Sequence, residues 1–249
     1  MSTPKNPTVA AMVLAAGRGN RMRPLTDHTP KPLLAVHGKP LMLWPMDALQ
    51  AGGFHRVLVN TAWLGEQIAD RLAAWAATEP RAELAFSHEG QAFGYALETA
   101  GGIARALPGL GDVFWVLAGD VYAPDFAFTQ ASVDRFTASG LLAHLWLVPN
   151  PPHNLRGDFG LSPAGLALNQ ADGELFTYST IGLFSRALFE APWCDILPGN
   201  PQGTAAALAP LLRAAMDAGQ VSAELYTGRW TDVGTPDRLE ELNLSTNAP

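Results

Sequence analysis

Two glycines and four positively charged residues lie close together near the amino end of the chain, between residues 14 and 32. Gly17 and Gly19 lack a Cβ atom, so the backbone there can approach a ligand closely, and the N–H groups of such a loop form a cradle for anions. The charged residues are Arg18, Arg21, Arg23 and Lys31. Because the chain as a whole has a net charge of -7, this local positive charge predicts a phosphate-binding loop.

This loop fits neither of the two common phosphate-binding motifs. It lacks the G-K-[ST] of a P-loop, and Met22 occupies the third glycine position of the dinucleotide-binding fingerprint. That fingerprint also places an acidic residue after the second strand, where this chain has Asn60. These differences argue against a nicotinamide-dependent dehydrogenase. A glycine turn with solvated arginines is the structural alternative to phosphate binding.

Two aspartates that are far apart in the sequence each follow a predicted strand. Asp120 lies in LAGDVY and Asp232 in RWTDVGT. A parallel sheet presents its chemistry at the carboxyl ends of its strands, and carboxylates are the hard oxygen ligands that Mg²⁺ prefers. An aspartate at a strand end is also a common turn or cap residue. Two such carboxylates at one edge of a sheet would supply ligands for Mg²⁺, and from the residues alone this role and that of a turn or cap stay open.

Apolar periodicity indicates the elements that must position these residues. Strands are predicted over residues 9–15, 56–60, 83–87, 112–118, 143–148, 158–161, 176–184, 221–226 and 229–233. Helices are predicted over residues 40–51, 65–77, 99–107 and 205–218, and from residue 236 onward. Pro45 is expected to kink the first helix or shift its start. The last two strands are expected to form a hairpin that turns at Thr227 and Gly228.

The order of these elements predicts the fold class. Strands and helices alternate up to residue 118, which is typical of an α/β protein with a doubly wound, mostly parallel mixed sheet. The later half is richer in strands and is interpreted as an insertion into that plan. No repeat or linker divides the chain, so one domain spanning residues 1–249 is expected.

Composition excludes several classes of protein. With 48% hydrophobic and 16% charged residues, the chain is expected to fold into a globule. Its acidic balance disfavours a nucleic-acid groove, which needs a basic field. No apolar run is long enough for a signal peptide or a membrane span, and Cys194 has no second cysteine with which to form a disulfide. We therefore expect a cytoplasmic protein that binds neither nucleic acid nor membranes.

The glycine and arginine loop resembles the signature loop of the nucleoside-diphosphate-sugar pyrophosphorylases, the sugar nucleotidyltransferases. The matching residues are Leu14, Gly17, Gly19, Arg21, Met22, Pro24, Thr26, Lys31 and Pro32, with Asn20 in place of a common threonine. The resemblance implies a Rossmann-like nucleotidyltransferase fold in which the loop (Leu14, Ala15, Ala16, Gly17, Arg18 and Gly19) wraps the triphosphate. It implies that Arg21 contacts the β- and γ-phosphates, that Lys31 lies near the reacting phosphoryl group, and that Asp120 and Asp232 hold the catalytic Mg²⁺.

The segment at residues 89–102 resembles a bacterial subgroup of that family, the N-acetylmuramate 1-phosphate uridylyltransferases of peptidoglycan recycling. The shared features are L-E-T-x-G-G-I, N-x-A-W-L-G-x-Q-I and R-G-D-F. The resemblance implies nucleotide contacts from Glu89, Glu98, Thr99 and Ala100, with Glu98 standing where the family has glycine. Extra residues at 93–95 depart from the subgroup and are expected to alter the lid over the base.

Sugar recognition is less fully specified by the sequence. The resemblance implies sugar contacts from Asp158 and Gly160, in a sugar-binding half at about residues 140–240 that follows a nucleotide-binding half at about residues 8–125. A strand turn is the alternative role for these two residues. The family's E-K-P sugar-phosphate motif is absent, and Arg156 is a candidate substitute for its lysine.

These observations predict an enzyme that transfers a nucleoside monophosphate, UMP from UTP, onto a sugar 1-phosphate, N-acetylmuramate 1-phosphate, and releases pyrophosphate. The sugar phosphate is already an anion, so no general base is required. The alternatives are a mannose 1-phosphate guanylyltransferase, a glucose 1-phosphate thymidylyl- or uridylyltransferase, and a regulatory homologue that senses nucleotide sugars. The expected assembly is a monomer or a small homo-oligomer.

Overall fold

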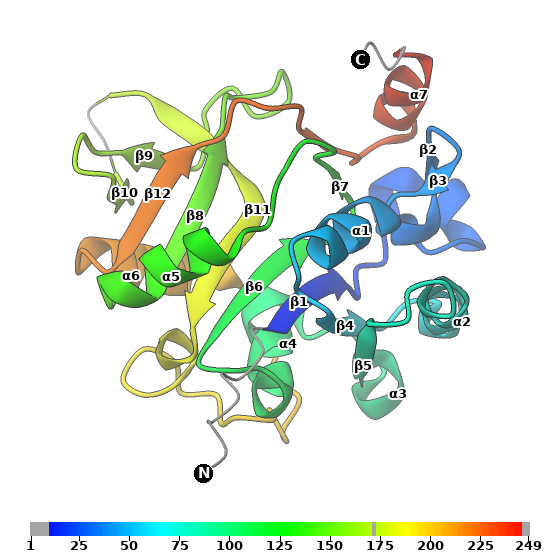
Figure 1. The fold of residues 1–249 in the computed structure, drawn as a ribbon, viewed down its shortest axis with the longest axis horizontal. Coiled ribbons are helices and arrows are strands. Elements are labelled where there is room, and N and C mark those ends of the chain that lie inside the picture. Colours follow the sequence, from blue (N-terminus) through cyan, green and yellow to red (C-terminus); the bar gives the residue numbers. More distant parts are fainter. Residues whose placement is uncertain (1–9, 171–172, 246–249) are drawn as a thin grey trace.

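A computed structural model describes residues 10–170 and 173–245 of the protein (Figure 1). Its strands are β1 Ala10–Ala15, β2 Ala35–Val36, β3 Lys39–Pro40, β4 Arg56–Thr61, β5 Glu83–His88, β6 Val113–Ala118, β7 Val121–Tyr122, β8 Ala143–Val148, β9 Phe159–Leu161, β10 Ala167–Leu168, β11 Leu175–Ser185, β12 Val221–Leu225 and β13 Thr231–Asp232. Its α-helices are α1 Leu43–Ala51, α2 Gly65–Ala76, α3 Glu89–Phe93, α4 Glu98–Ala106, α5 Gln130–Ser139, α6 Leu208–Asp217 and α7 Pro236–Leu244. Short 3-10 helices lie at Asn20–Met22, Leu25–Asp27, Lys31–Leu33, Leu107–Gly109 and Arg186–Phe189.

Within the described residues, nine strands form one mixed sheet. The order along the sheet is β10-β9-β11-β6-β1-β4-β5, and β8 pairs with both β11 and β12. Strands β6, β1, β4 and β5 are parallel, whereas β11 runs antiparallel to β6 and to β8. The α/β class and the mostly parallel mixed sheet predicted from the sequence are therefore confirmed.

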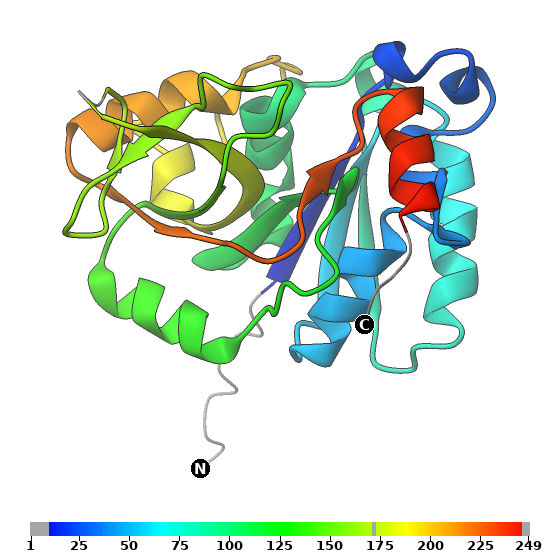
Figure 2. The same ribbon diagram turned by 90° about the horizontal axis from the view of Figure 1, so that it is seen from above.

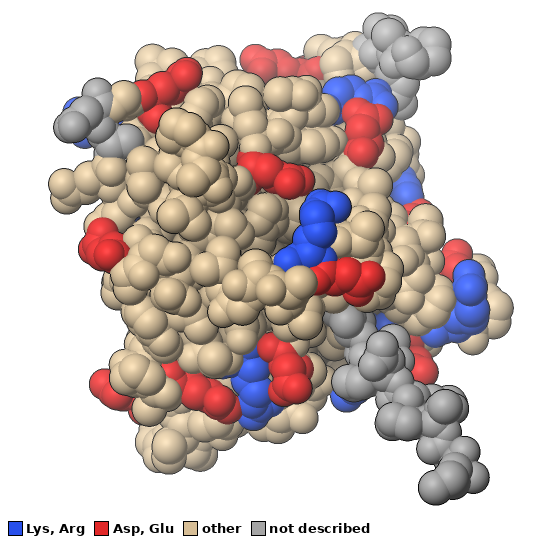
Figure 3. Space-filling view, turned by 60° about the vertical axis from the view of Figure 1, so that its left-hand side comes forward, with Lys and Arg blue, Asp and Glu red and all other residues tan. Residues whose placement is uncertain are grey.

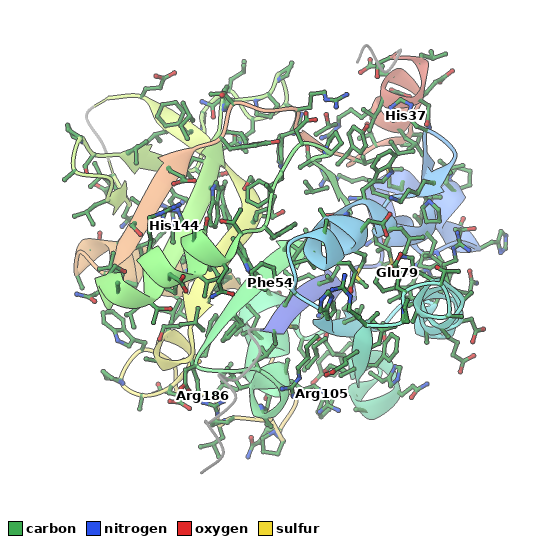
Figure 4. The ribbon with its side chains drawn as sticks, in the orientation of Figure 1. His37, Phe54, Glu79, Arg105, His144 and Arg186 are labelled. Carbon is green, nitrogen blue, oxygen red and sulfur yellow. The ribbon has the colours of Figure 1, made fainter. Side chains whose placement is uncertain are left out.

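Helices cover both faces of this sheet, as Figure 2 shows for α4 and α6 on one side and α1 and α5 on the other. The first side holds a core in which Ile103 of α4 and Leu212 of α6 are buried with Phe114 of β6. The second holds a core that includes Phe54, which lies between α1 and the sheet in Figure 4 and meets Trp115 edge-on at a centroid distance of 5.8 Å. Burial on both faces explains why the central strands are continuous apolar runs.

Most predicted elements are present, with shifted ends. The strands expected at the sheet centre all form, although Val9 lies outside the described residues. The first helix begins at Leu43, because Pro40 instead pairs in β3, and Pro45 occupies the first helical turn, where a missing N–H costs little. The helix expected from residue 205 begins at Leu208, because the backbone of Ala206 is bonded to α4 and to Leu97.

The predicted hairpin at residues 221–233 is wrong. Strand β12 pairs in parallel with β8, and β13 pairs antiparallel with β7. Between them, both Arg229 Nε and its NH2 donate to the carboxylate of Asp125 at 2.7 Å, and Trp230 Nε1 donates to Ser179 O at 3.1 Å. These long-range bonds direct the chain away from β12 and toward β7, which begins one residue after Asp120.

Helix α5 was not predicted, although its ends carry recognisable signals. The side chain of Thr129 accepts a hydrogen bond from Ser132 N at 3.1 Å, and Gly140 ends the helix with a φ of +67°. Both features are typical of helix caps. The short helix α3 was also not among the predicted elements.

The outer surface of the described residues presents no long basic field on the face drawn in Figure 3, where acidic and basic side chains are interspersed. None of the helices in residues 10–170 and 173–245 has the length and apolarity needed to cross a membrane.

Candidate active site

Two adjoining pockets open at the carboxyl ends of β1 and β6, and both are lined by Leu14, Gly17 and Asp120. The smaller, of about 280 Å³, is formed mainly by the glycine and arginine loop. The larger, of about 690 Å³, extends from there across the sheet between α4, α6 and β11. This is the edge at which a parallel sheet is expected to present its ligands.

The backbone of the loop explains why it contains glycine at two places. Gly19 has a φ of +68°, and a Cβ there would lie 3.0 Å from Thr26 Cγ2 and 3.2 Å from Lys31 Cβ. Thr26 Oγ1 also donates to Gly19 O at 2.8 Å, which closes the loop on itself. A Cβ at Gly17 would meet nothing within 4 Å, so that residue borders open space. One glycine is thus needed for the turn, and the other leaves room for a ligand.

The arginines of the loop have different partners. Arg18 NH1 donates to Thr26 O at 2.7 Å, and its guanidinium pairs with Asp27 and lies 3.6 Å from the centroid of the Trp63 ring. Arg23 pairs with the same carboxylate at 2.7 Å, and the two guanidinium groups hydrogen-bond to Asp27 and lower its pKa, even though desolvation acts in the opposite direction. Arg21 lines the smaller pocket, is exposed, and has no ion-pair partner among the described residues. It is therefore the arginine of the three that can bind an anion in the pocket.

Lys31 and Asp120 form an ion pair in the wall of the smaller pocket. The Nζ of Lys31 lies 2.5 Å from Asp120 Oδ2, and its side chain is only 11% exposed. Gly119 N donates to Leu14 O at 2.9 Å, which fixes the end of β6 against the end of β1. The ion pair joins two residues that are 89 positions apart in the sequence.

Asp232 is brought next to Asp120 by the pairing of β13 with β7. In that ladder Asp232 stands opposite Val121, and Val233 N donates to Asp120 O at 3.1 Å. Asp232 Oδ1 lies 2.7 Å from Arg238 NH1 and 2.8 Å from His153 Nε2. The two aspartates that the sequence analysis singled out therefore have adjacent backbones, and each carboxylate has a cationic or protonatable group against it.

The carboxylates of Asp120 and Asp232 suit a Mg²⁺ ion that takes only some of its ligands from the protein. Among the described residues, no group of three or more His, Cys, Asp or Glu side chains is arranged to hold a metal ion. Two neighbouring carboxylates suit an ion that keeps several water molecules and takes its other ligands from substrate phosphates. Lys31 and Arg238 already place positive charge on these oxygens.

Asn60, at the carboxyl end of β4, connects Ala15, at the start of the glycine and arginine loop, to the wall of the larger pocket. Its Oδ1 accepts from Ala15 N at 2.8 Å, and its Nδ2 donates to Glu89 Oε1 at 2.7 Å. Glu89 Oε2 accepts in turn from Leu97 N at 2.7 Å, and burial raises the pKa of the Glu89 carboxyl. Sequence reasoning did not assign a role to Asn60, although a polar residue that ends a buried strand is a usable signal.

Replacing Asn60 with Leu should lower the free energy of unfolding by about 2–4 kcal/mol, because it leaves the N–H of Ala15 and an oxygen of Glu89 buried without partners. Urea denaturation monitored by circular dichroism measures this change. The exposed Gln91, changed to Leu, is the matched control and should stay within about 0.5 kcal/mol of the wild type. Equal stability of the two variants would contradict this assignment.

The structure places most of the predicted site residues in the pocket walls. Those that line either pocket are Leu14, Ala15, Ala16, Gly17, Gly19, Arg21, Lys31, Glu98, Thr99, Asp120 and Asp158. Their roles toward a ligand stay predictions. Glu98 adopts a φ of +56°, the left-handed conformation that suits the glycine usual at its position in the family.

Five predicted contacts do not line the pockets. Arg18 is turned onto Trp63 and Asp27, as described above. Glu89 is fully buried behind the wall, with both of its oxygens bonded to the chain. Ala100 N donates to Ala206 O, and Gly160 pairs within the sheet between β10 and β11. Asp232 is beside the wall, which its neighbour Gly234 lines. For the first four, the structure supports a structural role rather than a direct ligand contact.

The extra residues around position 93 pack against the protein. Tyr95 Oη donates to Gly203 O at 2.9 Å, and the guanidinium of Arg105, labelled in Figure 4, lies 4.7 Å from the centroid of the Phe93 ring. Arg156 is exposed and lines neither pocket. The candidate sugar-phosphate cation suggested by the sequence is thus not in the pocket wall.

The larger pocket contains further residues that sequence reasoning missed. Thr180 has a φ of +64° at an irregularity of β11, and its Oγ1 is buried without a hydrogen-bond partner in the described part of the chain. Tyr178 lies beside it, and burial raises the pKa of its hydroxyl. Arg213 completes the wall from α6. No local sequence signal marks Thr180. Arg213 could have been found, because it borders the apolar face of an amphipathic helix.

The chain matches a known protein family and resembles two relatives over nearly its full length. The model of the nucleotidyl transferase family matches residues 10–162. The chain is 47% identical over 244 residues, 96% of its length and 98% of the relative's, to the N-acetylmuramate alpha-1-phosphate uridylyltransferase of Neisseria meningitidis. It is 31% identical over 237 residues, 91% of its length and 92% of the relative's, to the protein of that name from Caulobacter vibrioides.

Solved structures resemble the fold as well. A Bacillus anthracis protein described as a glucose-1-phosphate thymidylyltransferase superposes with a TM-score of 0.75 at 18% identity, covering 94% of each chain. At that identity the likeness supports the fold alone.

Proposed function

The chain belongs to the nucleotidyl transferase family, and we propose that it transfers UMP from UTP to N-acetylmuramate 1-phosphate and releases pyrophosphate, as the names of its two full-length relatives suggest. A single observation carries this proposal. Arg21, Lys31 and Asp120 line one pocket, and Asp232 lies beside Asp120. The arrangement combines an anion cradle with a pair of carboxylates at one edge of the sheet. Such a combination suits the transfer of a phosphoryl group between two negatively charged substrates.

The chemistry requires little more than positioning and charge. An oxygen of the sugar 1-phosphate attacks the α-phosphorus of UTP, the bond from that phosphorus to the bridging oxygen breaks, and pyrophosphate leaves. The attacking phosphate is an anion near neutral pH, so no side chain has to remove a proton from it. Arg21 is proposed to bind the β- and γ-phosphates, and Lys31 the phosphoryl group that is transferred.

Asp120 and Asp232 are proposed to hold Mg²⁺. When bound there, the ion supplies positive charge that offsets the charge of the phosphates. Lys31 and Arg238, which contact the carboxylates, would then exchange those contacts for phosphate oxygens or solvent.

The larger pocket is proposed to hold the base and the sugar. Asn60, Glu98 and Thr99 line its side nearest β4 and α4, next to the phosphate loop, and are candidates for the nucleoside. Asp158, Tyr178 and Thr180 line the side nearest β9 and β11 and are candidates for the sugar. We propose that the reaction takes place in the cytoplasm, where UTP is available, and serves the recycling of peptidoglycan sugars.

Pyrophosphate release should be fastest with UTP and N-acetylmuramate 1-phosphate. We expect kcat/KM for this pair to exceed that of ATP, GTP or CTP, and that of glucose or mannose 1-phosphate, by at least about 100-fold. An enzyme-linked pyrophosphate assay over all pairs of nucleotide and sugar measures this preference. Preference for GTP with mannose 1-phosphate, or for a glucose 1-phosphate, would replace the proposed substrates. Binding without any release of pyrophosphate would indicate a regulatory protein.

A further inference from the structure

Arg213 is the basic residue in the wall of the larger pocket. The other charged residues in this wall are acidic: Glu98, Asp120 and Asp158. Arg213 lies on the face of α6 that also presents Leu208 and Leu212 to the pocket, one to two helical turns from the start of the helix. Helix α6 is at the left of Figure 1, whereas the glycine and arginine loop that follows β1 is at the right.

The guanidinium of Arg213 is held in place by uncharged groups. Its NH1 donates to Asn169 Oδ1 at 2.6 Å and approaches Asn169 O at 3.3 Å. Asn169 is itself fixed by Asp217, at 3.0 and 3.1 Å from the two carboxylate oxygens. The guanidinium carbon lies 5.1 Å from the centroid of the Phe159 ring, which also lines the pocket. The side chain is thereby ordered before any ligand binds, which lowers the entropy cost of a contact with a ligand.

Arg213 forms no direct ion pair in the described residues; Asp217, one turn along α6, contacts it only through Asn169. No carboxylate lies within ion-pair distance of it there, and its Nε and NH2 have no hydrogen-bond partner in that part of the chain. Asp158, the nearest pocket acid in sequence to Phe159, is engaged by Tyr178 N at 2.8 Å and by Asn154 Nδ2 at 3.3 Å. Two donor groups of a positioned guanidinium therefore remain for a ligand.

Arg213 stands well away from the phosphate-binding loop. Phe159 of β9, on which it packs, is separated from β1 by β11 and β6, a span of about 14 Å at the usual strand spacing. A sugar whose phosphate lies at Lys31 and Asp120 would direct its more remote substituents toward α6. Arg213 is thus placed to meet a group on the sugar ring, not the phosphate at its anomeric carbon.

We propose that Arg213 is a specificity-determining residue that binds a carboxylate carried by the sugar ring of the substrate. This inference rests on the proposed function and deepens it, since it assigns the acidic group of a muramate to one side chain. A guanidinium pairs with a carboxylate through two parallel N–H···O bonds, which gives both strength and geometry. Because the other charged residues of the pocket are acidic, the same cation offsets the repulsion that a carboxylated sugar would meet.

The test compares a sugar that has the carboxylate with one that lacks it. N-acetylmuramate 1-phosphate and N-acetylglucosamine 1-phosphate share their ring and phosphate, and only the first has the lactyl carboxylate. The proteins are the wild type, Arg213→Met, Arg213→Lys and the control Arg135→Met, an exposed arginine on α5. Calorimetry gives the dissociation constant of each sugar phosphate, pyrophosphate release gives kcat and KM, and melting temperatures report folding.

Arg213→Met should weaken binding of the muramate phosphate by about 10–100-fold, mainly through KM, and change binding of the glucosamine phosphate by less than about 3-fold. Arg213→Lys should recover part of the loss, and Arg135→Met should match the wild type. Equal losses for both sugars would show a merely structural role for Arg213, and no loss for either would show no role; both outcomes overturn the proposal. If the wild type neither binds nor uses any sugar 1-phosphate, the proposed function fails as well, a result distinct from the other two.

Discussion

Replacing Asp120 with Asn should reduce kcat by at least about 1,000-fold while the protein remains folded. The substitution keeps the size of the side chain and removes its charge. Asp120 borders both pockets and lies against Lys31 at 2.5 Å. An amide is a much poorer ligand than a carboxylate for a hard divalent ion. Mg²⁺ should therefore bind more weakly, and a higher Mg²⁺ concentration should be needed to saturate the variant.

A second measurement separates metal binding from turnover. UTP with Mg²⁺ should raise the melting temperature of the wild type, because a ligand that binds the folded state stabilises it. That rise should largely disappear in Asp120→Asn, and in Asp232→Asn if the neighbouring carboxylate shares the ion. The exposed Asp134 on α5, changed to Asn, is the control and should keep both activity and the rise.

Two outcomes would contradict this assignment. One is near-normal kcat in Asp120→Asn at the Mg²⁺ concentration that saturates the wild type. The other is a melting temperature lowered by more than about 5 °C without ligand, since the loss of activity would then reflect the broken ion pair with Lys31 rather than loss of metal.

Replacing Arg21 with Ala should reduce kcat by at least about 100-fold and leave the melting temperature unchanged. Arg21 is exposed, lines the smaller pocket, and has no ion-pair partner among the described residues, so its removal costs the fold little. Toward the substrate it is proposed to stabilise the charge that develops on the leaving pyrophosphate. The substitution should therefore lower kcat by a larger factor than it lowers the affinity for UTP.

The neighbouring Arg23 provides the matched control. It has the same side chain two residues away, pairs with Asp27, and is 60% exposed. Arg23→Ala should change kcat by less than about 5-fold, because it removes an exposed ion pair of small energetic value. Steady-state kinetics of both variants, with circular dichroism to verify folding, distinguishes a specific role from the general charge of the loop. Equal losses in the two variants would contradict the specific role of Arg21.

Several features of the site could be predicted because they depend on short stretches of sequence. The loop at residues 14–32 carries its own conformational signals in Gly17 and Gly19. Asp120 follows a buried apolar run, which forms β6 as expected. Parallel strands meet at one edge of a sheet, so these local patterns together placed the phosphate loop and Asp120 at the same edge.

Other features depend on which distant segments meet, and local patterns do not contain that information. Residues 229–233 have the composition of a hairpin strand, yet β13 pairs with β7 because Arg229 and Trp230 bond to Asp125 and Ser179. That pairing, not the expected hairpin, is what brings Asp232 beside Asp120.

The amino-acid sequence by itself determined the α/β class, the glycine and arginine loop at the end of the first strand, and the family resemblance, because each arises from residues close together in the chain. Only the tertiary structure decided which charged side chains are left for a ligand. Arg18 and Glu89 are engaged by the protein, whereas Arg21 and Arg213 border the pockets with donors to spare. The physical reason is that the partner of a charged group is chosen by packing between segments that can be a hundred residues apart, and a sequence pattern specifies the charge but not its partner.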